Sequence, residues 1–311
     1  MDTPSGPGNG PGNELGNFLR TRRALLRPED VGLPSYGGQR RVPGLRREEL
    51  AMLAGVSAAY YTRLEQGQSA NASDGVLDAL ARALRLDADE HAHLRNLARP
   101  GRAARRPAPR AASVRPGVRQ LAEAMGEIPV IVLDHRYDVL HWNPLGHALT
   151  AGHLAADAPA RPAERPNAQR LLFLDPHARE LYPRWELEAR RAVAALRLEA
   201  GEHPEDRALA ELIGELSMKS KEFTALWARH KVLSCTSGTK DFHHPVVGSL
   251  TLSYEMLRAP GAEGAAQQSV LAYSAEPGSP SEAALRLLAS DLTTAAPAPR
   301  VEHDRQGPTV R

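Results

Sequence analysis

A run of small, polar and basic side chains follows the Gly-Val-Ser sequence at residues 55–57. Small side chains allow close approach to DNA and can contact a thymine methyl group, whereas arginine and glutamine form hydrogen bonds with base edges. The side chains of this run that we predict to contact DNA are Ser57, Ala58, Ala59, Tyr60, Thr62, Arg63 and Gln66. This composition is typical of a surface that recognises the major groove.

Four arginines that precede this run are assigned to the same surface. Arg40 and Arg41 lie in a Gly- and Pro-rich loop, and Arg46 and Arg47 begin the next predicted helix. A helix N-terminus already favours an anion, so we expect Arg46 and Arg47 to contact phosphate groups. The alternative for the basic loop, and for the arginines of segment 99–116, is a solvated surface without a partner.

Two helices must cross closely to present these side chains. Ala51 lets the helices approach, and Gly55 supplies the left-handed residue that ends the first helix. Val56 fills the core between them, and Ser57 caps the second helix. The side chains predicted to face inward are Leu50, Leu53, Ala54, Tyr61 and Leu64. This is the helix-turn-helix geometry, in which the second helix enters the major groove.

Three further helices complete an all-α domain over residues 15–98. One spans 15–26, Ser73 caps another, and Asp87 with Glu90 forms a capping box that begins the last. Five helices in this order resemble the phage-repressor-like (XRE) helix-turn-helix family.

Charge is divided unevenly along the 311 residues. The formal net charge of +2 combines about +7 over residues 1–119 with about −5 over residues 120–311. A basic first part and an acidic second part indicate two domains with different partners, the first of them an anion such as nucleic acid.

Composition also predicts the domain boundaries. Residues 1–14 and 291–311 are expected to be disordered, 99–116 to form an Arg/Pro-rich linker, and 117–290 to form a second domain. The chain has no apolar run long enough to cross a membrane and no signal peptide. We therefore expect a cytoplasmic, nucleoid-associated protein without a membrane partner.

The second domain has the pattern of an α+β fold. Runs 128–133 and 137–142 predict a hairpin, and further strands are predicted at 232–236, 248–257 and 270–274. The helices predicted between them include one from Asp175 to Gly201, and Ser279 with Glu282 caps a closing helix. This order suits a PAS-like sensor, in which a ligand lies between the sheet and the inserted helices.

Candidate ligand and catalytic groups are sparse in this domain. His243 and His244 are adjacent on a predicted strand and therefore point to opposite faces, which argues against a shared metal ion. Cys235, the single cysteine, is expected to be a half-buried structural thiol. The pattern contains no nucleophile–base pair, so we predict no enzyme, no metal and no cofactor. The candidate ligand-binding residues, which ordinary core packing would explain equally well, are Trp142, Phe173, Trp185, Trp227 and His230.

Several longer motifs resemble the MmyB-type transcription regulators of actinobacteria. In the second domain they are residues 170–176, 215–217, 223–230, 244–248 and 275–279. In the first domain they are residues 42–50 and 60–65. The resemblance implies a DNA-binding regulator with a PAS-like ligand-binding domain, and a long-chain fatty acid or similar apolar molecule as its ligand.

The predicted function is therefore sequence-specific binding to a double-stranded DNA operator, modulated by a small apolar ligand in the second domain. A homodimer is expected because helix-turn-helix proteins commonly bind two half-sites. Two alternatives remain open for the second domain. It is either a dimerisation module without a ligand or a sensor that binds haem or flavin.

Overall fold

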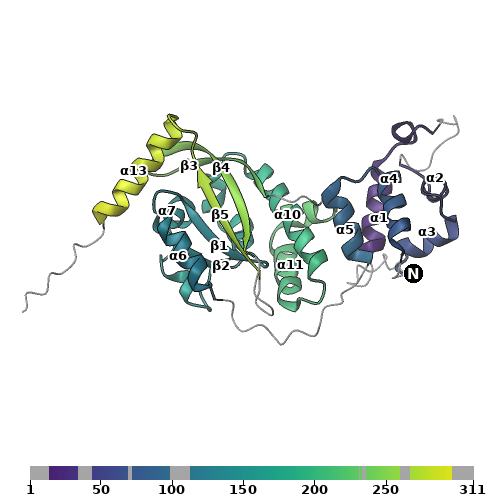
Figure 1. The fold of residues 1–311 in the computed structure, drawn as a ribbon, viewed down its shortest axis with the longest axis horizontal. Coiled ribbons are helices and arrows are strands. Elements are labelled where there is room, and N and C mark those ends of the chain that lie inside the picture. Colours follow the sequence, from purple (N-terminus) through teal and green to yellow (C-terminus); the bar gives the residue numbers. More distant parts are fainter. Residues whose placement is uncertain are drawn as a thin grey trace, which may run out of the picture.

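The computed structural model separates a group of helices at one end of the molecule from a sheet-containing domain at the other (Figure 1). The residues that it describes are 14–33, 44–68, 72–98, 113–230, 232, 236–259 and 267–295. Most of the predicted disordered ends, most of the linker, Arg40, Arg41 and Cys235 lie outside these residues. Glu14 and residues 291–295 were also predicted to be disordered, but they belong to helices, so the prediction is wrong for them.

Five α-helices form the N-terminal domain within its described residues, which confirms the predicted all-α fold. They are α1 (Glu14–Leu25), α2 (Arg47–Leu53), α3 (Ala58–Glu65), α4 (Asp74–Ala83) and α5 (Ala88–Ala98), with the 3-10 helix η2 (Pro28–Val31) after α1. Their core contains fully buried Phe18, Leu50, Tyr61, Leu64 and Leu80. The amphipathic faces that the sequence indicates are thus packed against one another.

Most predicted turn and cap residues of this domain take the expected geometry. Gly55 has a φ of 66°, and the Ser57 hydroxyl accepts a hydrogen bond from the backbone N–H of Tyr60 at 3.1 Å. The backbone N–H of Glu90 donates to the Asp87 carboxylate at 2.8 Å. Ser73 lies at the N-cap of α4, but its side chain makes no capping hydrogen bond, so the prediction that it caps the helix holds for its position only. Leu53 is an exception, because 36% of it is exposed at the end of α2 and the prediction that it faces inward is wrong.

A five-stranded antiparallel sheet forms the centre of the C-terminal domain and confirms the α+β class. Its strands are β1 (Val130–Asp134), β2 (Val139–Trp142), β3 (Ser237–His244), β4 (Gly248–Ala259) and β5 (Gln268–Ser274), in the spatial order β2-β1-β5-β4-β3. The early hairpin pairs as predicted, and β1 then pairs with β5 from the far end of the chain.

Helices cover both faces of this sheet. They are α6 (Pro116–Ala124), α7 (Pro144–Ala151), α8 (Ala168–Leu174), α9 (His177–Leu181), α10 (Trp185–Glu202), α11 (Arg207–Lys219), α12 (Lys221–Trp227) and α13 (Pro280–Ala295), with the short 3-10 helix η3 (Ala158–Ala160). Val130 and Val132 pack on one face with Ala122 of α6, and Ile131 and Leu133 belong to the larger core on the other face. Alternation along β1 therefore divides the domain into two layers of packing.

The single helix predicted from Asp175 to Gly201 is wrong, because two helices, α9 and α10, occupy that stretch. The Asp175 carboxylate accepts a hydrogen bond from the backbone N–H of His177 at 2.9 Å and begins α9. Pro183 then disfavours helical backbone at Tyr182, so α10 begins only at Trp185.

Three other predicted limits also differ from the structure. The strand expected at 232–236 begins instead at Ser237, although residues 233–235 lie outside the described part of the chain. Helix α6 begins at Pro116 and α13 continues to Ala295, so both helices cross the boundaries expected at 117 and 290. Composition marks the ends of a domain less sharply than helix periodicity does.

Candidate functional site

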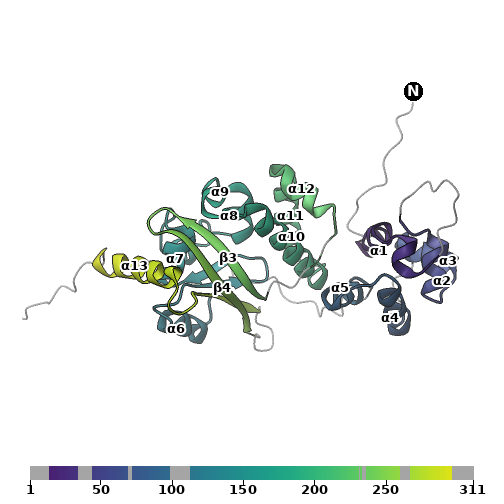
Figure 2. The ribbon, with the colours of Figure 1, turned by 90° about the horizontal axis from the view of Figure 1, so that it is seen from above.

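Helix α3, which carries most of the predicted DNA-binding residues, lies at the end of the molecule remote from the sheet (Figure 2). Ser57, Ala59, Arg63 and Gln66 are exposed. Ala58, Tyr60 and Thr62 are half-buried. The structure thus brings the predicted residues of the second helix together on one accessible surface.

Some of these polar groups already have partners within α3. The Thr62 hydroxyl donates to the backbone carbonyl of Ala58 at 2.8 Å, and the Arg63 guanidinium lies 5.9 Å from the centre of the Tyr60 ring. Arg63 and Gln66 remain solvent-facing and are long enough to reach a base edge.

A buried carboxylate holds α3 against its neighbours. Glu65 is fully buried, and its two oxygens accept hydrogen bonds from Arg23 Nε of α1 and Arg47 Nε of α2, each at 2.7 Å. Burial alone would raise the pKa of Glu65, but hydrogen bonds from Arg23, Arg47 and Tyr61 lower it below its usual value. The recognition helix is therefore fixed to α1 and α2 by charge as well as by apolar packing.

Glu65 also changes the interpretation of the two arginines at the start of α2. Arg47, predicted to contact phosphate, is ion-paired with Glu65 while 44% of its side chain remains exposed. Arg46 is exposed at the N-cap of α2, and its backbone N–H donates to Glu49 at 2.7 Å. No role for Glu65 or Arg23 could be predicted from local sequence patterns, because their pairing joins positions 42 residues apart.

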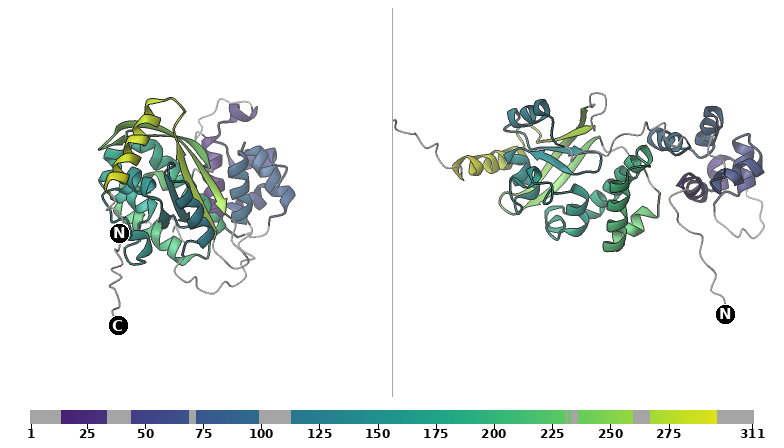
Figure 3. Two further views of the ribbon diagram at one scale, coloured as in Figure 1. Left: turned by 60° about the vertical axis from the view of Figure 1, so that its left-hand side comes forward. Right: turned by 90° about the horizontal axis from the view of Figure 1, so that it is seen from below.

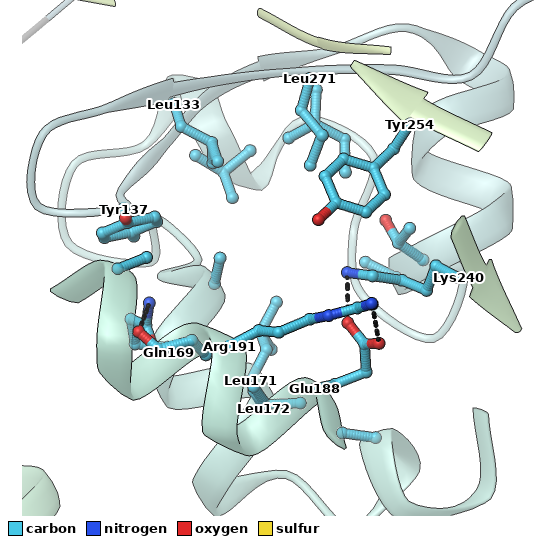
Figure 4. Close-up of a pocket in the computed structure, with 18 of the residues that line it drawn as sticks. Leu133, Tyr137, Gln169, Leu171, Leu172, Glu188, Arg191, Lys240, Tyr254 and Leu271 are labelled. Atoms are coloured by element: carbon cyan, nitrogen blue, oxygen red, sulfur yellow. Dashed lines mark hydrogen bonds and ion pairs between the residues drawn. The ribbon is translucent and has the colours of Figure 1, made fainter. Parts of the chain in front are cut away.

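A second candidate site is a cavity of about 180 Å³ between one face of the sheet and α8–α10. Most of its wall is apolar (Figure 4). The large apolar side chains of the lining are Ile131, Leu133, Val139, Trp142, Leu171, Leu172, Leu181, Leu198, Met256 and Leu271. Such a lining is typical of a site for a small apolar molecule.

One side of this cavity carries a cluster of charges. Glu188 of α10 is buried and lies between Lys240 of β3, at 3.1 Å, and Arg191, at 3.0 Å, as Figure 4 shows. Burial alone would lower the pKa of Lys240, but Tyr273, Tyr182 and Glu188 raise it above its usual value. The ammonium group is therefore charged at neutral pH, and the three groups together carry one excess positive charge.

Comparison with known families assigns both parts of the chain. Residues 114–288, more than half of the chain, match the model of the MmyB-like transcription regulator ligand binding domain. The chain belongs to this family. Residues 14–94 match the model of a helix-turn-helix domain. No curated protein matches the chain.

These matches show a DNA-binding transcription regulator with a ligand-binding domain, as the sequence motifs predicted. The domain content resembles a transcription regulator rather than an enzyme. No helix in the described residues is both long and apolar enough to cross a membrane.

Of the five predicted ligand-binding residues in this MmyB-like regulator, only Trp142 lines the cavity. Its indole N–H donates to the backbone carbonyl of Ala156 at 2.7 Å. Phe173 and Trp185 pack edge to face in a separate core with their ring centres 5.7 Å apart. Trp227 and His230 lie instead against Arg197 of α10, away from the cavity lining.

Two cavity residues that the sequence did not single out carry informative polar groups. Gln169 is buried, and its Oε1 atom has no hydrogen-bond partner within the described residues. Burial and the neighbouring Glu202 raise the pKa of Glu199 to about 7, although Arg258 lies 3.4 Å away. An amide and a carboxyl group that titrates near neutral pH therefore face the same cavity.

The histidines considered as metal ligands do not lie together. His243 is exposed, whereas the adjacent His244 is buried and contacts the backbone carbonyl of Ala148 at 3.0 Å, as expected for opposite faces of a strand. In the part of the chain that the structure describes, a different trio has ligand atoms within 4.8 Å of one another, namely Glu199, Glu202 and His203. Arg258 pairs with both carboxylates of this trio, so it is an ion-pair cluster.

Proposed function

We propose that this MmyB-like regulator binds a specific double-stranded DNA operator through α3 and that a small apolar ligand in the cavity modulates this binding. The observation that carries the proposal is the coexistence of an exposed recognition helix and an apolar cavity in one chain. A homodimer would place two copies of α3 over two half-sites.

The cavity supports an apolar ligand with an acidic or hydrogen-bonding head group. The excess positive charge of the cluster formed by Glu188, Lys240 and Arg191 favours a carboxylate at that side of the cavity, which is consistent with a fatty acid. Its volume of about 180 Å³ is close to the ~150 Å³ of a cavity that binds benzene. A long acyl chain would therefore require α8–α10 to move away from the sheet, and a haem or flavin would require a larger movement still.

Base recognition is tested by a matched pair of arginine variants. Arg63→Ala removes a side chain on α3, whereas Arg82→Ala removes an exposed one on α4. If Arg63 contacts a base, the first variant weakens specific binding by about 1–3 kcal/mol. Salt-dependent gel-shift titrations on DNA from upstream of the gene measure both variants. Equal affinity of Arg63→Ala and the wild type would contradict the assignment of Arg63.

Ligand binding is tested by denaturing extraction of the purified protein followed by mass spectrometry. We expect an apolar small molecule in the extract, and we expect the emptied protein to change its DNA affinity when dodecanoate is added as a probe. An empty extract, together with DNA binding that is insensitive to dodecanoate, would favour a pure dimerisation domain. A coloured protein would favour haem or flavin.

A further inference from the structure

Helix α10 contacts the cavity with one face and the DNA-binding domain with another. One face lines the cavity with Glu188, Arg191, Ala192, Ala195, Leu198 and Glu199. Another face carries Ala194, Arg197 and Gly201, which are buried at helical spacing. This second face lies beside α5 of the DNA-binding domain (Figures 2 and 3).

The contact between α5 and α10 is close. A Cβ atom added at Gly201 would lie 2.6 Å from the imidazole ring of His93 on α5. Only glycine therefore lets the two helices approach to this distance without a shift of the buried His93 ring or of one of the helices. The α3 surface lies at the other side of the DNA-binding domain, so docking leaves it exposed (Figure 2).

Arg197 anchors this contact from the ligand-binding domain. It is 2% exposed, and its guanidinium carbon lies 3.9 Å from the centre of the Trp227 ring. One guanidinium nitrogen lies 3.1 Å from His230 Nδ1 and 3.5 Å from Glu14 of α1. Arg22 of α1 donates to the backbone carbonyl of His230 at 3.3 Å. Side chains from both domains therefore meet around one buried guanidinium.

Polar groups at this contact are incompletely paired. Among the described residues, Nε of Arg22, Nδ1 of His93 and Nε of Arg197 are buried without a hydrogen-bond partner. Burial lowers the pKa of Arg197 to about 10, Glu14 opposes this shift and Arg22 adds to it. Buried polar groups without partners cost free energy, so the docked arrangement is stabilised less than its close packing suggests.

We propose that α10 transmits occupancy of the cavity to the DNA-binding domain by loosening the contact between Gly201 and α5. This inference rests on the proposed function, because it takes the cavity to be the ligand site. Added volume between the sheet and α10 displaces a helix whose neighbouring face is already packed against His93 without spare room. Tightly packed interfaces respond to such a displacement by changing between discrete arrangements.

The first test distinguishes an effect on the contact between α5 and α10 from the general effect of replacing a helical glycine by alanine. Gly201→Ala introduces a methyl group at the contact with His93, and Gly214→Ala makes the same change on α11, where a Cβ meets nothing within 4 Å. Amide hydrogen exchange of the full chain, without DNA or ligand, is the measurement. We expect several-fold faster exchange of α5 in Gly201→Ala and unchanged α5 exchange in Gly214→Ala. Wild-type exchange of α5 in Gly201→Ala would overturn the proposed docking contact.

The second test mimics a ligand from inside the cavity. Ala195→Leu adds apolar volume to the cavity face of α10, and Ala195→Ser keeps a small side chain at the same position. We expect the leucine variant, but not the serine variant, to accelerate exchange of α5. Exchange that changes in α8 and α10 but not in α5 would overturn transmission. Protection of α11 from exchange shows whether each variant is folded. If the leucine variant is not folded, Ala195→Val repeats the test with less added volume.

Failure of this inference is distinguishable from failure of the proposed function. The exchange experiments contain neither DNA nor ligand, so they report coupling between the cavity and α5 alone. Faster exchange of α5 in Ala195→Leu would support the coupling between the cavity and α5. If DNA affinity were at the same time insensitive to every extracted molecule, control of DNA binding by a ligand would be contradicted. Ligand-sensitive DNA binding that is identical in wild type and Gly201→Ala would overturn the coupling and preserve ligand control.

Discussion

Two buried charges hold different parts of this MmyB-like regulator together, and their surroundings differ. Glu65 lies inside the DNA-binding domain, where two guanidinium groups each approach it to 2.7 Å. Arg197 lies between the domains, where its neighbours are a backbone carbonyl, an imidazole and Glu14 at 3.5 Å, a side chain that is 45% exposed. The first charge is fully compensated and the second is not.

This difference indicates which contacts of the molecule are rigid and which can change. Hydrogen bonds lower the pKa of Glu65 in spite of its burial, whereas burial lowers the pKa of Arg197 in spite of Glu14. The environment of Glu65 favours its charged form, and that of Arg197 disfavours it. We therefore expect α3 to keep its place within the DNA-binding domain while the whole domain changes its attachment to α10.

The largest predicted effect is that of Glu65→Gln. Removing the charge of the buried carboxylate leaves the Arg23 guanidinium, 12% exposed, without its ionic partner, and breaking a buried pair in this way typically costs about 3–5 kcal/mol. The Arg47 side chain, 44% exposed, adds less because water can solvate it. We expect faster hydrogen exchange in α1–α3, a lower urea midpoint in circular dichroism and loss of specific DNA binding. Glu48→Gln, which changes an exposed acid in the first turn of α2, is the control. Wild-type stability of Glu65→Gln would remove the contrast with Arg197.

The next effect concerns pH, since the buried His93 and the half-buried His230 lie at the domain contact. Burial, Arg197 and Arg22 lower the pKa of His93 to about 3 and that of His230 to about 4. Both rings are neutral when docked and regain a pKa near 6.5 when exposed, so docking is unaffected above pH 6.5 and weakens as pH falls below it. The charged groups around the two rings, with the carboxylates that pair with them, are Arg20, Arg22, Arg197, Glu14 and Glu90.

For each histidine, the equilibrium constant for docking of the two domains falls by at most about tenfold per pH unit. The effect of His230 is smaller, because solvent partly screens this ring. We expect the radius of gyration from small-angle scattering to rise between pH 7 and pH 5. His230→Asn cannot titrate and tolerates the positive φ of 49° at this position, so it should reduce the slope. His243→Asn, at an exposed position on β3, should not. A radius independent of pH would indicate that the contact stays closed in spite of protonation.

A smaller effect compares matched serine caps in the two domains. The hydroxyl of Ser57 accepts from Tyr60 N–H at 3.1 Å on the surface, and that of buried Ser220 accepts from Phe223 N–H at the same distance. Loss of a cap costs about 0.5–2 kcal/mol, and we expect Ser220→Ala near the upper end because water cannot replace its buried hydroxyl. Urea unfolding of both variants is the measurement. Equal losses would show that burial does not distinguish the two caps.

Local signals of the sequence predicted much of this structure. Gly55, Ser57 and the Asp87–Glu90 pair act through neighbours within three residues, and all take the expected geometry. Alternating strand residues and the early hairpin likewise predicted the α+β domain. Such features depend on the backbone within one turn or one hairpin, so a single sequence is sufficient to identify them.

The parts that the sequence did not predict depend on contacts between distant segments. Glu65 looks like any acid at the end of a helix until α1 folds back and brings Arg23 beside it. Trp142 and Trp185 have the same chemistry, and only the packing of α8–α10 places the first on the cavity and the second in a closed core. Gly201 resembles a helix-ending glycine, whereas its role is to admit His93 from another domain.

The smallest predicted effect, on stability, is that of Arg197→Met, and it tests the comparison most directly. Methionine retains much of the apolar contact with Trp227 and removes a charge whose burial is poorly compensated. Replacing a buried ionic group by an apolar side chain of similar volume is often neutral or stabilising, so we expect the free energy of unfolding of the C-terminal domain to stay within about 1 kcal/mol of wild type. Because the tie to Glu14 is lost, exchange of α1 and α5 should nevertheless accelerate. A loss as large as that of Glu65→Gln would mean that Arg197 is structurally compensated after all, and the domain contact would then be rigid rather than adjustable.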